Sequence, residues 1–225
     1  MKNMRKWFVL AMCMLATSSL FSQQNDWAQF GRYAEANKSV ETPTRVVFMG
    51  NSITDGWWNT DSLFFKNNRY IGRGIGGQTT AQMLVRFRAD VIDLQPKAVV
   101  ILAGTNDIAQ NNGYIAPENI LGNIISMAEL AKANNIDVVL CSILPAYEYG
   151  WRKGLEPADK IIALNKMIKE YADRHNLTYV DYHSALKDAR NGLPEKYSKD
   201  GVHPTMEGYK IMERLISEAL KNIET

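Results

Sequence analysis

The chain has 225 residues, which is long enough for one domain with a sizeable core. Its 26 Lys and Arg residues slightly outnumber its 24 Asp and Glu residues, but three of the basic residues lie within the first 22 positions, so the remainder carries a net charge of −1. Because no basic stripe follows, the composition excludes nucleic acid as an expected partner.

The first 22 residues have the layout of a secretory signal peptide. Basic residues precede an apolar run from Trp7 to Leu15, which is too short to span a membrane as a helix. A lipid anchor at Cys13 is disfavoured, because the large Met12 precedes it and the apolar run continues beyond it. We therefore expect residues 1–22 to be removed on export and residues 23–225 to form a single domain in the periplasm or outside the cell. Several serines are equally suited to precede the cleaved bond.

Beyond this leader, apolar runs alternate with amphipathic segments. Strands are predicted over Arg45–Gly50, Tyr70–Ile75, Lys97–Ala103, Asp137–Leu144 and Thr178–Asp181. Helices are predicted over Trp27–Ala36, Thr80–Leu94, Pro117–Asn134, Glu156–His175 and Thr205–Ile223. Strands that alternate with helices form a parallel sheet with helices on both faces. The sequence therefore predicts the α/β class with a five-stranded parallel sheet.

Four short polar segments follow, or are placed to lie beside, the carboxyl ends of these strands, which is where parallel sheets bind ligands. The first segment is Gly50–Thr54. Ser52 lies just beyond the first strand at an expected helix start, where exposed backbone N–H groups favour an attacking alkoxide and an oxyanion. Ser52 is thus a candidate nucleophile, and the alternative is that it only caps the helix.

The second segment, Gly74–Gly77, belongs to a stretch that matches the pattern GxGxxG. A dinucleotide site would also need an acidic residue about twenty residues further on, whereas Asp90 and Asp93 come earlier and inside a predicted helix. A nucleotide cofactor is therefore not expected. Gly77 could instead let its backbone N–H approach a substrate oxygen, and a simple tight turn is the alternative.

The third segment is Gly104–Asp107, an abrupt polar cluster after the most hydrophobic strand. The Asn106 amide can donate to an oxyanion without changing its protonation state. Asn or Asp that caps the next turn is the alternative.

The fourth segment, Asp200–His203, is the most specific of the set. Asp200 precedes His203 by three residues on a short loop that contains glycine, close enough to accept the Nδ1–H of the imidazole. This contact would fix the tautomer and stabilise the imidazolium that forms when Nε2 takes a proton from serine. His175 closes a polar helix and is expected to be solvated, whereas His183 is expected in the core or behind the site.

Metal and thiol chemistry are not expected. The chain has no HExxH motif, no paired cysteines and no carboxylate cluster, so a metal site is not predicted. Cys141 lies in a strongly apolar run, which indicates a buried and inert thiol.

In this order and spacing, the four segments resemble the SGNH (GDSL-type) hydrolase superfamily, over residues 45–208. Residues 74–80 and 103–108 are most similar to secreted acylhydrolases like the catalytic subunit of platelet-activating-factor acetylhydrolase. The resemblance implies a flavodoxin-like, three-layer α/β/α sandwich. It also implies the roles of six groups: Ser52 as nucleophile, His203 as base, Asp200 as its orienting partner, and an oxyanion hole made of the backbone N–H groups of Ser52 and Gly77 and the side chain of Asn106.

The sequence departs from the family pattern beside the nucleophile. Asn51 replaces the usual Asp, and Ile53 replaces the usual Leu. Asn51 keeps the size and hydrogen bonding of Asp but loses its charge, and we count it among the candidate substrate contacts. The triad does not depend on either position.

The expected function is a serine esterase that forms an acyl-enzyme and needs no metal or organic cofactor. A non-catalytic carbohydrate-binding module on the same fold is the alternative. The substrate is expected to be a small-molecule or carbohydrate ester, and the oligomeric state leaves no trace in the sequence.

Aromatic side chains suggest the substrate class. Trp57 and Trp58 follow the candidate nucleophile, and Tyr147, Tyr149 and Trp151 follow the fourth strand. Such rings can stack on sugars, which favours O-acetylated carbohydrate as substrate. The alternatives are that the rings are packing anchors, or that an apolar groove accepts the acyl chain of a lysophospholipid or thioester.

Overall fold

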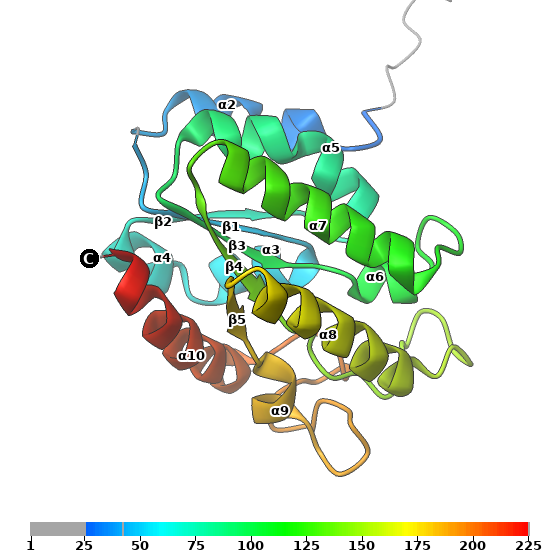
Figure 1. The fold of residues 1–225 in the computed structure, drawn as a ribbon. Coiled ribbons are helices and arrows are strands. Elements are labelled where there is room, and N and C mark those ends of the chain that lie inside the picture. Colours follow the sequence, from blue (N-terminus) through cyan, green and yellow to red (C-terminus); the bar gives the residue numbers. More distant parts are fainter. Residues whose placement is uncertain (1–25, 42, 225) are drawn as a thin grey trace, which may run out of the picture.

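The computed structural model describes residues 26–41 and 43–224, so the expected signal peptide lies outside the described residues. Its centre is a parallel sheet with the strand order β2-β1-β3-β4-β5, which Figure 1 shows almost edge-on. The strands are β1 (Val46–Gly50), β2 (Tyr70–Gly74), β3 (Ala98–Leu102), β4 (Asp137–Cys141) and β5 (Thr178–Val180). The predicted five-stranded parallel sheet is confirmed, and each observed strand lies within its predicted range.

Successive strand residues point to opposite faces of the sheet, so β1 contributes to two separate cores. Val47 and Met49 pack in one core, and Val46 and Phe48 pack in the other. The first core is covered by α5 (Thr80–Asp90), α7 (Pro117–Ala133) and α8 (Pro157–Arg174). The second is covered by α3 (Ser52–Thr60), α4 (Ser62–Asn68), α9 (Tyr182–Leu186) and α10 (Met206–Glu224). These two helical layers on either side of the sheet make the three-layer α/β/α sandwich (Figure 1).

Proline and residues with positive φ set the ends of the two longest helices on the α7–α8 face. Pro117 and Pro157 each stand in the first turn, where no intrahelical N–H is needed. Asn135 and Asn176 follow the helix ends in the left-handed region, with φ of 59° and 51°. This region is one that asparagine tolerates better than most residues.

The N-terminal helix prediction, Trp27–Ala36, is wrong. The structure has a short 3-10 helix, η1 (Phe30–Arg32), and then α2 (Ala34–Lys38). Gln29 has a φ of 57°, a left-handed conformation that an α-helix cannot contain, so the helix cannot continue from Trp27 into η1. The predicted helix Thr80–Leu94 is divided as well, because α5 ends at Asp90 and a 3-10 turn, η2 (Ile92–Leu94), follows.

The carboxyl ends of β1 and β3 meet where the strand order reverses direction. The helix α3 begins immediately after β1, and the short α6 (Thr105–Ile108) begins after β3. These neighbouring ends place Ser52 and Asn106 at the same edge of the sheet, the edge at which open α/β folds bind ligands.

Two further features bear on function. Among the described residues, no helix has the length and hydropathy that a membrane span requires. Cys141 is buried in β4, and burial raises the pKa of its thiol to about 12, so it is inert as a nucleophile.

Candidate active site

Ser52 is the first residue of α3, and its neighbour Asn51 caps that helix. The Asn51 side-chain oxygen accepts the backbone N–H of Ile53 at 3.0 Å, and Asn51 is only 1% exposed. Capping, the alternative considered for Ser52, is therefore done by Asn51. The expectation that Asn51 contacts substrate is wrong, because its amide is buried and engaged with the helix.

The side chains of Ser52, His203 and Asp200 form one chain of contacts. His203 Nε2 lies 2.9 Å from Ser52 Oγ, and His203 Nδ1 lies 2.6 Å from Asp200 Oδ2. The three residues come from opposite ends of the sequence, and the structure brings them together as the spacing of the four segments predicts. This arrangement lets the imidazole take a proton from the hydroxyl while the carboxylate holds its other nitrogen.

The loop before α10 holds Asp200 in place. Its Oδ1 accepts the backbone N–H groups of Val202 at 2.9 Å and His203 at 2.8 Å, and the hydroxyl of Ser198 at 3.0 Å. Partial burial opposes ionisation of Asp200, but the hydrogen bonds from the His203 side chain and from the two backbone N–H groups outweigh it, so the pKa stays well below its usual range. Asp200 is therefore an anion whenever His203 takes up a proton.

Asn106 lies in α6 with its side chain buried and oriented. Its Nδ2 donates to the backbone oxygen of Gln78 at 2.9 Å, which fixes the amide plane. An amide nitrogen carries a second N–H, which remains available to a developing oxyanion. Gly104 makes this turn possible, because it has φ of 119° and a Cβ there would lie 2.7 Å from Ile143.

Gly77 lies on the exposed loop between β2 and α5. Its φ of 76° is in the left-handed region that favours glycine. A Cβ on the preceding Gly76 would lie 3.9 Å from the Ser52 Cβ, so this loop passes directly beside Ser52. The position suits a backbone oxyanion donor.

Gly74, the middle glycine of the GxGxxG match, has a packing role. A Cβ on Gly74 would lie 2.2 Å from the backbone nitrogen of Asp55, so glycine is what lets the end of β2 approach α3. Close strand–helix contact therefore accounts for Gly74 without a nucleotide.

The aromatic candidates divide by burial. Trp57 is 1% exposed, stacks on Tyr209 with ring centroids 5.6 Å apart, and donates its indole N–H to Glu213 at 3.2 Å. The expectation that Trp57 contacts substrate is wrong, because the ring is part of the core between α3 and α10. Tyr149 is also buried, with its hydroxyl 2.9 Å from Thr105 Oγ1.

Three of the aromatic rings remain accessible. Trp151 is 48% exposed, and its ring centroid lies 6.5 Å from that of His203. Trp58 lines a 410 Å³ pocket between α3, β2 and α2. Tyr147 lines a second cleft of 500 Å³, where Arg190 lies 4.9 Å above its ring. Trp151 is thus the aromatic residue beside the Ser52–His203 pair.

Sequence reasoning missed Asn111. Its Oδ1 accepts the indole N–H of Trp151 at 3.1 Å, and its Nδ2 donates to the Gly77 carbonyl at 3.2 Å. Asn111 therefore links the Trp151 ring to the loop that carries Gly77. Two consecutive asparagines followed by glycine resemble an ordinary turn, so the pattern does not indicate this role.

The other two histidines are placed differently. His175 stacks against Tyr171 at the end of α8, with centroids 4.3 Å apart. His183 is buried in α9, and burial lowers the pKa of its imidazole. Among residues 26–41 and 43–224, no group of three or more His, Cys, Asp or Glu side chains is placed to hold a metal ion.

A buried carboxyl group lies directly behind Asn106. Asp107 is 2% exposed and accepts the backbone N–H of Thr80 at 3.0 Å and its hydroxyl at 2.6 Å. Burial raises the pKa of Asp107 to about 6, and the hydrogen bonds from Thr80 only partly offset this effect.

Comparisons with known proteins agree with this geometry. The sequence profile of the GDSL-like Lipase/Acylhydrolase family matches residues 48–211. A GDSL-like lipase from Bacteroides thetaiotaomicron has 50% sequence identity and a TM-score of 0.85, with 88% of this chain and 99% of that chain covered. A solved protein from Bacteroides fragilis has 50% identity and a TM-score of 0.88, with 90% and 100% covered.

A curated relative carries a more specific name. The acetylxylan esterase of Xylanibacter ruminicola is 25% identical over 82% of this chain and 45% of its own length. The chain spans less than half the length of the first curated relatives that it matches.

Proposed function

Because the chain belongs to the GDSL-like lipase/acylhydrolase family of the SGNH superfamily, we propose that it is a serine esterase that cleaves carboxylic esters with short acyl groups. Ser52 is the nucleophile, His203 the base and Asp200 the group that orients the base. The observation that carries this proposal is the continuous contact from Asp200 through the two ring nitrogens of His203 to Ser52 Oγ.

The reaction proceeds in two steps. Ser52 Oγ attacks the ester carbonyl while His203 Nε2 takes its proton, and the Asp200 carboxylate stabilises the imidazolium. His203 then gives this proton to the departing alcohol. In the second step His203 takes a proton from water, whose oxygen attacks the acyl carbonyl, and His203 then returns this proton to Ser52 Oγ as the carboxylic acid leaves.

Three N–H groups stabilise the tetrahedral oxyanion: the backbone N–H of Ser52, the backbone N–H of Gly77 and the second Nδ2–H of Asn106. Ser52 stands at the amino end of α3, whose exposed N–H groups favour negative charge. Removal of one such donor costs about a hundred- to a thousandfold in rate in enzymes of this kind. The chemistry requires no metal or organic cofactor.

O-acetyl groups on carbohydrate are the substrate that we propose. Trp151 supports this choice, because half of its side chain is exposed beside His203 and its indole N–H is already held by Asn111. A fixed aromatic face next to the reacting atoms suits a sugar ring. The similarity to the acetylxylan esterase of Xylanibacter ruminicola points the same way.

A lipid ester is the second candidate. The 410 Å³ pocket between α3 and β2 has apolar walls from Val40, Ile71 and Trp58, and it reaches Asp55, one helical turn below Ser52. The 50% sequence identity of this chain to the GDSL-like lipase from Bacteroides thetaiotaomicron also supports a lipid ester.

For either substrate we propose export, with residues 1–22 removed as a signal peptide, so that the enzyme meets its ester outside the cytoplasm.

A chain-length series tests the proposal. Wild-type protein and the Ser52→Ala variant are assayed with acetyl, butyryl and octanoyl esters of p-nitrophenol. We expect a steep preference for acetyl in the wild type and no turnover in the variant. A preference for octanoyl would select the lipid alternative. Undiminished turnover by Ser52→Ala would reject the esterase mechanism.

A further inference from the structure

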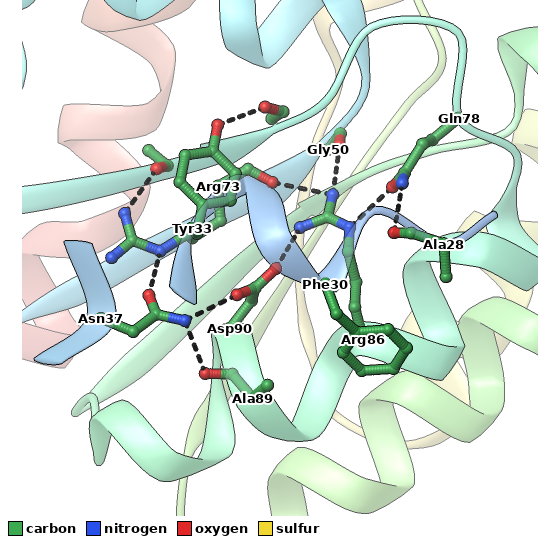
Figure 2. A network of polar contacts seen from close by, with 12 residues as sticks. Ala28, Phe30, Tyr33, Asn37, Gly50, Arg73, Gln78, Arg86, Ala89 and Asp90 are labelled. Atoms are coloured by element: carbon green, nitrogen blue, oxygen red, sulfur yellow. Dashed lines mark hydrogen bonds and ion pairs between the residues drawn. The ribbon is translucent and has the colours of Figure 1, made fainter. Parts of the chain in front are cut away.

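Beneath the site lies an arginine that the mechanism does not use. Arg86, on α5, has a relative exposure of 0%, yet each of its three guanidinium nitrogens donates a hydrogen bond (Figure 2). Nη2 donates to the carbonyls of Gly50 at 3.0 Å and Arg73 at 2.9 Å. Nε donates to Gln78 Oε1 at 2.6 Å, and Nη1 donates to Asp90 Oδ2 at 2.8 Å.

The partners of Arg86 belong to the segments that carry the oxyanion donors. Gly50 is the last residue of β1, two positions before Ser52. Gln78 immediately follows Gly77. The backbone carbonyl of Gln78 also accepts the Asn106 amide at 2.9 Å. A single guanidinium is therefore linked to all three donors, through Gln78 to Gly77 and Asn106 and through Gly50 and Asn51 to Ser52.

Outer contacts hold this network from the other side. The Gln78 side chain donates to the Ala28 carbonyl at 2.7 Å, and Asn37 donates to Asp90 at 2.8 Å (Figure 2). Asp90 is 1% exposed, so its ion pair with Arg86 is fully buried. The guanidinium is therefore fixed by groups on several elements and cannot move with one loop alone.

Stability alone is a weak reason for such an arrangement. A buried ion pair often contributes no more than well-packed apolar side chains of the same size. A planar fork with donors in fixed directions can, however, hold several carbonyls in one geometry, which a lysine ammonium cannot do. Because rates depend steeply on the placement of reacting groups, this rigidity has a direct use beneath an oxyanion hole.

We propose that Arg86 is a positioning residue, which fixes the Ser52 N–H, the Gly77 N–H and the Asn106 amide relative to one another through Gly50, Arg73 and Gln78. The proposal rests on the esterase function proposed above. Arg86 itself touches no substrate atom. Its contribution is to the transition state, where the oxyanion needs all three donors at once.

The Arg86→Lys variant tests this role, because lysine keeps a positive charge for Asp90 but loses the fork. We expect kcat for p-nitrophenyl acetate to fall about ten- to a hundredfold while KM changes little. This decrease in kcat is no larger than the decrease expected when one whole oxyanion donor is removed. The affinity for 2,2,2-trifluoroacetophenone, a ketone that forms an oxyanion adduct with an active serine, falls by a similar factor. A purely structural role would leave kcat per folded molecule and this affinity unchanged.

Leu220→Ala is the matched control for lost stability. Leu220 is fully buried in α10, in the core on the opposite face of the sheet from α5. We expect this variant to melt at a lower temperature with kcat unchanged. Gln78→Met is the second test variant, since it keeps the size of the side chain and the backbone carbonyl but removes the acceptor for Arg86 Nε. We expect it to lower kcat in the same way.

The outcomes separate the two proposals. If Arg86→Lys folds, with a cooperative melt and native near-UV circular dichroism, and its kcat equals that of the wild type, the positioning role is overturned while the esterase stands. If Arg86→Lys does not fold, Gln78→Met decides, and an unchanged kcat overturns the role in the same way. Wild-type protein that does not cleave the ester would instead reject the proposed function.

Discussion

Asp107→Asn should abolish a pH dependence of folding that a single buried carboxyl group creates. Asp107 lies behind Asn106 with 2% exposure, and burial raises its pKa from 3.8 to about 6. Asparagine has the same shape, and its oxygen can still accept hydrogen bonds from Thr80. Unlike aspartate, it never has to ionise inside the protein.

The free energy of unfolding falls with rising pH because the folded state binds the Asp107 proton more tightly than the unfolded chain does. Between pH 3.8 and about 6 the folded state keeps a proton on Asp107 that the unfolded chain has lost. Stability from this group is therefore complete below pH 3.8 and is lost as the pH rises through 6. At about 1.4 kcal/mol for each pKa unit, the difference amounts to about 3 kcal/mol of unfolding free energy.

Urea unfolding of the wild type and of Asp107→Asn across pH 4 to 8 measures this effect. The free energy of unfolding of the wild type minus that of the variant should fall by about 2.5 kcal/mol over this range, with most of the change between pH 4 and 6. Subtraction removes the opposite trend from carboxylates such as Asp200, whose pKa is lowered. A difference that stays constant with pH, or that rises, would refute the reasoning.

Three further substitutions test the site through p-nitrophenyl acetate turnover. His203→Ala should be nearly as inactive as Ser52→Ala, whereas His175→Ala should keep its kcat; equal losses in the two histidine variants would contradict the choice of base. Asn106→Ala should lower kcat by about a hundred- to a thousandfold with KM little changed, and an effect confined to KM would argue against an oxyanion donor. Trp151→Ala should lower kcat/KM for acetylated xylo-oligosaccharides by about tenfold and leave p-nitrophenyl acetate turnover close to wild type; equal losses on both substrates would exclude a sugar platform.

The sheet could be predicted from the sequence because its pattern is simple. Strands β3 and β4 are covered on both faces, so their residues are almost continuously apolar, and helices separate them. The same regularity places Ser52 and Asn106 at one edge, since parallel strands end together. His203 comes instead from the loop before α10, and only the structure shows that its Nε2 lies 2.9 Å from Ser52 Oγ.

Other features could not be predicted because they depend on which face of a helix is covered. Trp57 is a candidate substrate contact in the sequence because it follows Ser52 closely, but it lies on the covered face of α3, where its ring packs between Phe64 and Tyr209. The N-terminal segment gave a helical pattern, but the positive φ of Gln29 is invisible to periodicity. The sequence does indicate that Arg86 is unusual, because a charged residue there lies on the same helix face as the apolar Met83 and beside Phe87.

Covalent labelling of the wild-type protein with a fluorophosphonate, followed by peptide mass spectrometry, tests the central claim most directly. An activated serine beside an imidazole forms a stable adduct, so we expect one modified residue, Ser52, and a parallel loss of ester hydrolysis. Ser52→Ala should remain unlabelled. Esterase activity that survives complete modification of Ser52, or an adduct on a different serine that tracks the loss of activity, would contradict the account.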